Sequence, residues 1–264
     1  AAEVGCNTFL LEKGNELGGL ASLISKIPAK NRLADFPHYL MHRAEQLDNL
    51  YIFKNTEGTP ENIRKFHPNI IVSSTGSAPL LPPIAGLKDR IDNENHNIYS
   101  ILGMISHIND FPKDLEGKKV VVVGGGAVGL DVVEFFADRN ADISIVEMMD
   151  QIGRDLDPVS KNDTKTMMKK HNVHQLTKTA LLEVKDSSFL VKGDGEPYEL
   201  PFEYGFVCLG MRAQGQLYQS LAEEFSSEDV EIMNIGDSQR ARRIIDGTQE
   251  GRNILTILEQ RGYL

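Results

Sequence analysis

The sequence predicts an α/β protein made of two doubly wound, three-layer domains, with one domain inserted into the other. Three observations predict this fold. Strand-like and helix-like segments alternate along the chain. A glycine-rich loop follows the strongly apolar segment Val120–Val123. The two parts of the chain also resemble each other, because each contains an apolar strand that ends in Glu and a later strand that ends beside Gly.

The composition is that of a globular protein that binds neither nucleic acid nor membrane. Hydrophobic residues make up 41% and charged residues 25% of the 264 residues, enough for two cores. The net charge of -10 argues against nucleic-acid binding, and the basic cluster Arg240, Arg242 and Arg243 is too short to change this. No segment approaches the roughly 20 apolar residues of a membrane span. Two isolated cysteines, Cys6 and Cys208, and a start without secretory features indicate a cytoplasmic location.

The first part of the chain predicts half of a parallel sheet. Strands are expected at residues 8–12, 50–53 and 69–74, and a short helix at 60–66. A longer amphipathic helix is expected at 31–47, with an apolar side formed by Leu33, Phe36, Leu40, Ala44 and Leu47. Residues 77–115, which contain Pro79, Pro82 and Pro83, predict an irregular connector.

The second part predicts a complete unit of strand, helix and strand, followed by more strands. The first strand is Lys119–Val123, the helix runs through Val133 and Ala137, and the second strand is Asp142–Val146. Later strands are expected at 181–184, 189–192, 202–209 and 230–235, and a closing helix at 241–258. We therefore expect residues 1–113 and 214–264 to form one domain, interrupted by a second domain at 114–213.

The glycine-rich loop has the spacing of a dinucleotide-binding turn. Gly124 permits the tight turn, Gly126 lets a pyrophosphate approach the backbone, and Gly129 allows close packing of helix and strand. The phosphates would sit at the start of the helix, at Ala127 and Val128, where free N–H groups favour anions. The alternative is a glycine-rich turn in an unrelated α/β protein.

An acidic residue at the end of the next strand completes this motif. Glu147 lies 18 residues after Gly129, a position suited to the ribose hydroxyls of a dinucleotide. A carboxylate there repels a 2′-phosphate. The sequence therefore predicts that residues 114–213 bind NADH in preference to NADPH.

Glu12 ends a strand as Glu147 does, but no glycine loop precedes it. The strand, loop and helix before Glu147 occupy Lys119–Arg139, whereas only eleven residues precede Glu12. We therefore expect the N-terminal strand of this domain and its glycine loop to be missing from the chain and to lie upstream of Ala1. The alternative is that Glu12 is only a solvated strand end.

Five motifs occur in the order seen in a known group of proteins: Glu12–Gly19, Ser74–Pro79, Val120–Gly129, Leu209–Arg212 and Ile235–Asp237. In this order the chain resembles the flavoproteins of the pyridine nucleotide-disulfide oxidoreductase type. It is most similar to the C-terminal region of the old-yellow-enzyme-related NADH:flavin oxidoreductases, such as 2,4-dienoyl-CoA reductase, 2-enoate reductase and trimethylamine dehydrogenase. Met148–Asp157 and Arg240–Gly251 also resemble that subgroup.

The resemblance implies two Rossmann-like cofactor sites. The residues expected around NAD(H) are Gly124, Gly126, Ala127, Val128, Gly129, Glu147 and Gly210. The residues expected around FAD are Glu12, Lys13, Gly19, Leu20, Thr75, Gly76, Gly236 and Asp237. Asp131 departs from the pattern, because many relatives have Glu there, and its placement near the nicotinamide is left open.

The implied activity is that of an NADH-dependent flavoprotein oxidoreductase module, which passes hydride from NADH to FAD and electrons onward to a flavin or iron–sulfur partner. The partner implied is an upstream part of the same polypeptide, a flavin-binding barrel with FMN and a 4Fe-4S cluster. A dithiol mechanism is excluded within this chain, because residues 13–60 contain no Cys and Cys208 stands alone in an apolar strand.

No catalytic residue is assigned from the sequence, and no metal site, because His38 and His42 lack a third ligand. Two alternatives stay open. In the first, the chain is a structural module that binds ADP or NAD without turnover. In the second, it is a free-standing NADH oxidase or ferredoxin reductase whose N-terminus was trimmed.

Overall fold

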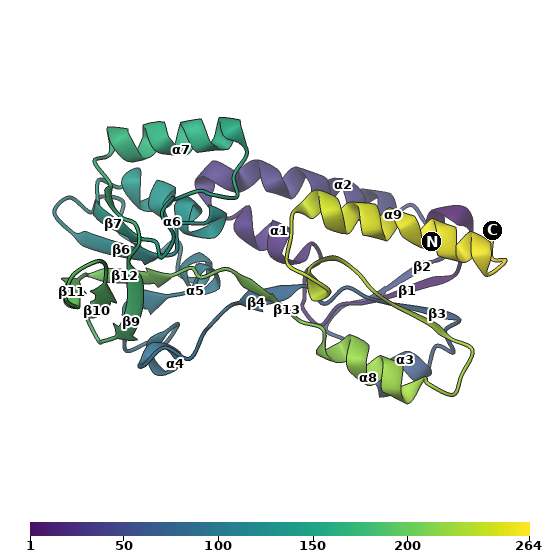
Figure 1. Ribbon diagram of the computed structural model, residues 1–264. Coiled ribbons are helices and arrows are strands. Elements are labelled where there is room, and N and C mark those ends of the chain that lie inside the picture. The colour runs from purple at the N-terminus through teal and green to yellow at the C-terminus, as the bar shows by residue number, and fades with distance from the viewer. The chain divides into compact units, whose positions relative to one another are not determined.

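The computed structural model describes residues 1–264 and divides them into two compact units (Figure 1). Unit 1 contains Ala1–Ser25, Lys30–Ala78 and Met211–Leu264, and unit 2 contains Lys26–Ala29 and Pro79–Gly210. Unit 2 therefore interrupts unit 1 along the chain. Its main segment begins at Pro79, whereas the inserted domain was expected to begin at residue 114.

Unit 2 is built on a parallel sheet of five strands in the order β5-β12-β6-β7-β8. This is the parallel, crossed-over sheet of a doubly wound fold. The strands are β5 (Ile98–Tyr99), β6 (Lys119–Val123), β7 (Asp142–Val146), β8 (His174–Leu176) and β12 (Tyr204–Val207). A second, antiparallel sheet has the order β11-β10-β9, formed by β9 (Ala180–Val184), β10 (Ser188–Lys192) and β11 (Tyr198–Pro201).

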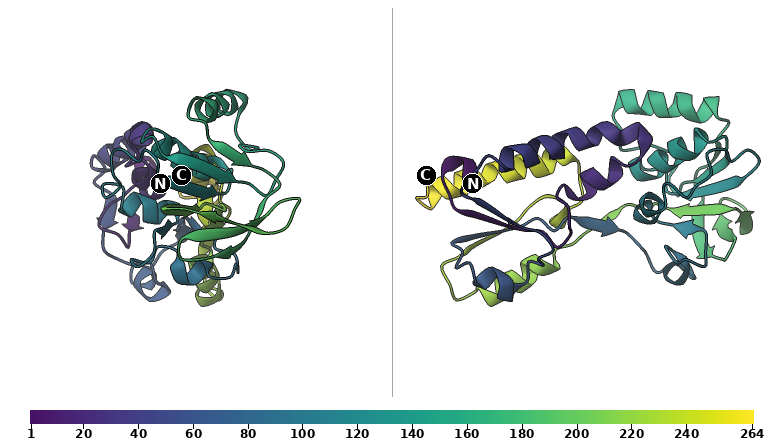
Figure 2. Two further views of the ribbon diagram at one scale, coloured as in Figure 1. Left: turned by 90° about the vertical axis from the view of Figure 1, so that its left-hand side faces the viewer. Right: turned by 180° about the vertical axis from the view of Figure 1, so that it is seen from behind.

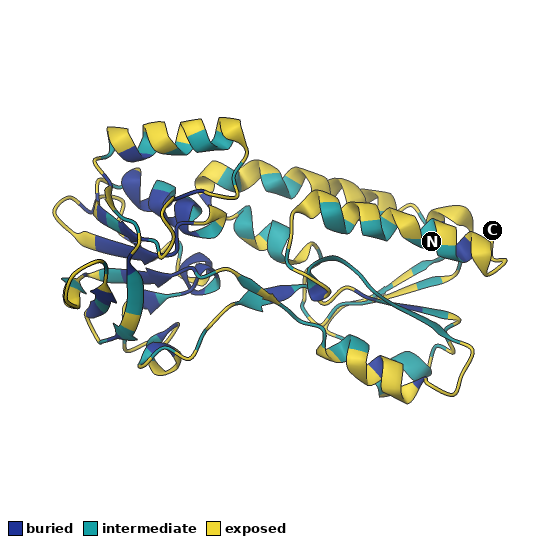
Figure 3. Ribbon diagram, viewed as in Figure 1, coloured by how far each residue is buried: buried dark blue, intermediate teal, exposed yellow.

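The core of unit 2 explains why its central strands read as continuous apolar runs. Val120 and Val122 are fully buried, and Val121 and Val123 are 3% exposed, so both faces of β6 are covered. Helix α6 (Ala127–Ala137) packs on β6, β7 and β12, and the ring of its Phe136 contacts that of Phe206 in a tilted arrangement with centroids 4.8 Å apart. Figure 3 shows these strands as buried along most of their length.

Residues 79–113 are more regular than the expected connector. They contain α4 (Leu87–Arg90), β5 and α5 (Ile101–Ser106), and Leu87, Ile98 and Met104 are fully buried. The expectation was wrong because the prolines occupy only 79–83, and β5 then joins the sheet through pairing with the distant strand β12. Helix α7 (Pro158–Lys170) was not predicted either, because it is a polar helix in which only Met168 is buried.

Unit 1 contains two separate parallel pairs of strands instead of one continuous sheet. β1 (Thr8–Leu11) pairs with β2 (Leu50–Phe53), and β3 (Ile70–Ser73) pairs with β14 (Glu231–Asn234). No strand connects β1 to β3. A third, short pair joins β4 (Ser77–Pro79) and β13 (Met211–Ala213).

The free edge of β1 carries backbone groups that no strand satisfies. The amides of Thr8 and Glu12 donate to Asn49 and Phe53 on the β2 side, each at 2.9 Å. Because amides alternate along a strand, those of Phe9 and Leu11 face the opposite edge. No strand of the structure pairs with this edge of β1 or joins β1 to β3.

The helices of unit 1 lie on both sides of these strands. Figure 2 shows the strands between α3 and α8 on one side and α2 and α9 on the other. The bounds are α1 (Gly19–Ile24), α2 (Asp35–Ala44), α3 (Pro60–Arg64), α8 (Gln216–Glu224) and α9 (Ile244–Gln260), with 3-10 turns at Ala2–Val4, Pro28–Ala34 and Gly236–Ser238. A small core forms where Ile71 meets Leu221 and Phe225.

The apolar side expected for helix 31–47 is only partly buried. The α-helix begins only at Asp35, and Phe36 and Leu40 are 43% and 48% exposed. Leu33, Ala44 and Leu47 are half-buried. Elsewhere the chain contains no helix that is both long and apolar enough to cross a membrane.

Candidate functional site

The glycine loop of unit 2 connects β6 to α6, and two of its glycines are required by close backbone contacts. Gly124 has a φ of +111°, and a Cβ at this position would lie 2.1 Å from the carbonyl oxygen of Cys208. A Cβ at Gly129 would lie 1.9 Å from the carbonyl oxygen of Gly124. Both positions therefore exclude any side chain, as the sequence predicted for the tight turn and the helix–strand packing.

Gly126, by contrast, stands beside open space. It caps α6, and a Cβ there would meet no atom within 4 Å. No side chain caps the start of α6, so the first-turn amides at Ala127 and Val128 are available to an anion. The open space above Gly126 and these amides together fit a pyrophosphate.

The carboxylate of Glu147 is tied to this loop. Its Oε2 accepts a hydrogen bond from the Gly125 amide at 2.6 Å, and its Oε1 accepts one from the Met149 amide at 2.7 Å. Each carboxylate oxygen has a second lone pair, so each retains the capacity to accept one ribose hydroxyl. Gly125 and Met149 were not identified from the sequence, because their contribution comes from the backbone alone.

The segment after Glu147 folds back over the glycine loop. The amide of Gly153 donates to the carbonyl oxygen of Gly125 at 2.7 Å, and Ile152 is only 9% exposed. Met148, by contrast, is 68% exposed. The segment Met148–Asp157, whose sequence resembles one subgroup, therefore has a structural role: it packs against the glycine loop.

Gly210 and Cys208 lie at and just before the C-terminal boundary of unit 2. Gly210 has a φ of +100°, and its carbonyl oxygen accepts the Leu80 amide at 2.9 Å. Cys208 is buried, and this burial, together with the nearby charge of Asp131, raises the pKa of its thiol to about 12. The thiol is therefore protonated and unreactive at neutral pH, as expected for a structural cysteine.

The expected FAD residues lie on three segments of unit 1. Glu12 follows β1, and its Oε1 accepts the Gly14 amide at 2.7 Å. Gly18 and Gly19, at the start of α1, both have positive φ angles. Lys13 is exposed and Leu20 is half-buried, so this stretch offers a surface site and not a closed pocket.

The second and third segments meet at Asp237. The hydroxyl of Ser77 donates to Asp237 Oδ2 at 3.0 Å, and the Thr75 hydroxyl donates to the carbonyl oxygen of Gln214 at 2.6 Å. Gly76, with a φ of +75°, and Gly236, with a φ of +64°, form the turns beside them. An open hollow of about 310 Å³ lies near the start of α8, but its lining contains none of the expected FAD residues.

The two units therefore fit their cofactors to different degrees. Unit 2 has the complete set of glycine loop, helix start and ribose-side acid. Unit 1 has the acid Glu12 and the Gly236–Asp237 turn, but no glycine loop precedes β1 among the described residues. The residues of unit 1 fit the two ends of an FAD and not its pyrophosphate.

Comparison with known proteins agrees with this arrangement. The chain is 25% identical over 252 residues to an NADH oxidase of Thermoanaerobacter brockii, with 95% of this chain and 37% of the oxidase aligned. It is 26% identical over 289 residues to a metal reductase of Desulforamulus reducens, with 96% of this chain and 40% of the reductase aligned. The chain therefore spans well under half the length of these relatives.

A solved structure shares the fold. A 2-naphthoyl-CoA reductase complex superposes with a TM-score of 0.80 at 22% sequence identity, over 95% of this chain and 36% of the reductase.

A family model gives the assignment directly. The model described as "Pyridine nucleotide-disulphide oxidoreductase" matches residues 41–233, more than half of the chain. Proteins of this family are flavoprotein oxidoreductases that bind FAD and NAD(H). The chain belongs to the pyridine nucleotide-disulphide oxidoreductase family.

Proposed function

We propose that this chain is the nucleotide-binding part of an NADH:flavin oxidoreductase of the old-yellow-enzyme-related group. The observation that carries the proposal is the complete loop in unit 2, in which Gly126 is open and Glu147 is held by backbone amides. The lengths of the NADH oxidase and the metal reductase support a larger polypeptide, because this chain covers 37% and 40% of them.

In this proposal each part of the unit 2 site has one task. The amides at the start of α6 hold the pyrophosphate of NADH, Glu147 accepts the hydroxyls of its adenosine ribose, and Gly210 leaves room beside the nicotinamide half. FAD bound in unit 1 would supply the redox chemistry, that is, acceptance of a hydride and release of electrons one or two at a time. Glu12 then holds the adenosine end of FAD, and Asp237 holds the flavin side.

Electrons would leave the FAD for a partner flavin or iron–sulfur cluster. We place that acceptor, an FMN with a 4Fe-4S cluster, in an upstream barrel of the same polypeptide. No cysteine of this chain takes part, since Cys208 is buried with a raised pKa and Cys6 has no cysteine near it in sequence.

The test is a titration of the purified chain with NADH and with NADPH, followed by protein or nicotinamide fluorescence. We expect saturable NADH binding and weaker binding of NADPH. Equal affinity for the two nucleotides would remove the role given to Glu147, and no binding of either would remove the proposed function.

A second candidate is a structural module that holds ADP or NAD without turnover. It is favoured by one observation, the lack of a glycine loop before β1 in unit 1. The two candidates differ in the response of bound flavin. Loss of the 450 nm absorbance on addition of NADH supports the oxidoreductase, and a stable oxidised spectrum supports the structural module.

A further inference from the structure

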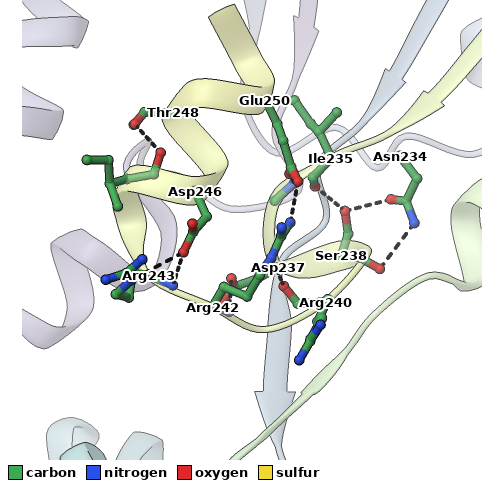
Figure 4. A network of polar contacts seen from close by, with 12 residues as sticks. Asn234, Ile235, Asp237, Ser238, Arg240, Arg242, Arg243, Asp246, Thr248 and Glu250 are labelled. Atoms are coloured by element: carbon green, nitrogen blue, oxygen red, sulfur yellow. Dashed lines mark hydrogen bonds and ion pairs between the residues drawn. The ribbon is translucent and has the colours of Figure 1, made fainter. Parts of the chain in front are cut away.

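The turn after β14 is closed by a ring of polar contacts that joins it to α9 (Figure 4). The Gly236 amide donates to Glu250 Oε2 at 2.6 Å. The other oxygen of Glu250 pairs with the guanidinium of Arg242. The Arg242 amide in turn donates to Asp237 Oδ1 at 2.9 Å, and the peptide bond between Asp237 and Gly236 completes the ring.

The ring fixes the carboxylate of Asp237 from one side, and β4 fixes it from the other. Oδ1 accepts from the Arg242 backbone, and Oδ2 accepts from the hydroxyl of Ser77. A side chain held at both oxygens has one orientation. Each oxygen still has one lone pair available for a hydroxyl donor.

Helix α9 lies close enough to the turn for this contact. A Cβ at Gly247 would lie 3.5 Å from the Cα of Gly236, an ordinary contact distance. Glu250 is three residues further along α9 and therefore on the same side of the helix. Gly247 thus brings the backbone of α9 to the turn, and Glu250 reaches its amide.

Charge gives the pair a second role. Glu250 and Arg242 have side chains that are only 24% and 28% exposed. The Gly236 amide and Arg242 lower the pKa of Glu250, so this carboxylate is ionised at neutral pH. Without Arg242, that negative charge would stand uncompensated beside a site meant for the anionic FAD.

We propose that Glu250 and Arg242 are positioning residues of the FAD site: together they hold Asp237 in its binding orientation, and Arg242 offsets the negative charge of Glu250 beside the turn. This inference rests on the proposed function, because it assumes that Asp237 meets FAD. Arg243 provides a matched control. It lies in the same segment, is 84% exposed, and pairs with Asp246 outside the ring.

These two roles, orientation of Asp237 and charge compensation, predict how the FAD affinities of a set of variants should rank. Arg242→Gln should weaken FAD binding by roughly fivefold, because it leaves Glu250 unpaired. Glu250→Gln should have a smaller effect, because its amide oxygen still accepts the Gly236 N–H. The double variant, Arg242→Gln with Glu250→Gln, should bind FAD better than Arg242→Gln alone, and Arg242→Lys should restore most of the affinity. Arg243→Gln should bind FAD as the unaltered chain does.

The experiment measures three quantities on the full chain and each variant: the FAD dissociation constant by flavin fluorescence, the NADH dissociation constant, and hydrogen exchange at the Gly236 and Arg242 amides. We expect faster exchange at both amides and weaker FAD binding in Arg242→Gln, with NADH binding unchanged. Faster exchange with unchanged FAD affinity would overturn the inference, as would a double variant weaker than Arg242→Gln. Failure of the unaltered chain to bind FAD, with both amides still protected, would instead remove the FAD part of the proposed function and the inference with it.

Discussion

Glu147 accepts the backbone amide of Gly125 at 2.6 Å and thereby joins the end of β7 to the glycine loop of unit 2. The acid and the loop lie 22 residues apart in the chain. One carboxylate therefore has two functions in the proposed site: it shapes the loop, and it accepts the ribose hydroxyls.

The first prediction follows from this double function. Glu147→Arg should reduce the preference for NADH over NADPH or reverse it, because it replaces a carboxylate that repels the 2′-phosphate with a cation that attracts it. It should also weaken NADH binding, because the Gly125 and Met149 amides lose their acceptors. The ratio of the two dissociation constants is the measurement. A ratio equal to that of the unaltered chain would contradict the assignment.

The second prediction separates two glycines of the same loop. Gly126→Ala should leave the melting temperature almost unchanged, since its Cβ meets no atom, but should weaken NADH binding about tenfold or more by occupying the space of the pyrophosphate. Gly129→Ala should lower the melting temperature, because its Cβ lies 1.9 Å from the Gly124 carbonyl oxygen. Thermal melts and NADH titrations of both variants check this. If Gly126→Ala binds NADH normally, the phosphate does not lie there.

The third prediction concerns the cysteines. Iodoacetamide at pH 8 should alkylate Cys6, which is half-buried, much faster than Cys208, whose pKa is raised to about 12. Because the thiolate is the reactive form, Cys208 should stay unmodified until the protein unfolds. Peptide mass spectrometry gives both rates. NADH-dependent activity of the whole enzyme should also survive the double variant Cys6→Ala and Cys208→Ala, and a loss of turnover with the fold intact would show a redox role.

Much of unit 2 could be predicted from sequence because the features that determine it lie within short segments of the chain. Gly124 has a positive φ in the tight turn, Gly129 contacts the Gly124 carbonyl within the same strand–turn–helix segment, and Val120–Val123 is covered on both faces. The bond from Gly153 to Gly125 could not be predicted, because it joins two backbone groups and depends on no side-chain type. The place of residues 79–113 was missed because β5 reaches its sheet only by pairing Ile98 with the distant Gly205.

In unit 1, the positions of several strands could be predicted from sequence, but the burial of their side chains could not. Strands β1, β2, β3 and β14 were predicted at nearly their observed positions, whereas β4 and β13 were not. Even so, Phe9, Tyr51 and Phe53 remain 37–45% exposed. Alternation of apolar residues predicts a buried face, but it does not state what covers that face. In unit 1 the rings pack mainly on one another, with Phe9 and Tyr51 stacked at 5.1 Å.

The last prediction concerns the unpaired edges of β1 and β3. Both strands are parallel to their partners, so a strand that joined them would have to run parallel as well, and a glycine loop at its end would emerge beside Glu12. Such a strand would satisfy the amides of Phe9 and Leu11 and cover exposed apolar side chains. Each new hydrogen bond contributes about 1 kcal/mol and each buried large side chain about 2 kcal/mol.

Fusing a designed strand, a G-x-G-x-x-G loop and a helix to the N-terminus should therefore raise the melting temperature by at least about 5 °C. The same fusion should bind FAD tightly and purify yellow, whereas the 264-residue chain should hold FAD weakly, because only the fusion supplies a phosphate loop. A matched fusion in which the three loop glycines are replaced by alanine should keep the added stability in part but lose the colour. If the 264-residue chain itself purifies with one FAD per chain, tight FAD binding does not require an added strand and glycine loop between β1 and β3.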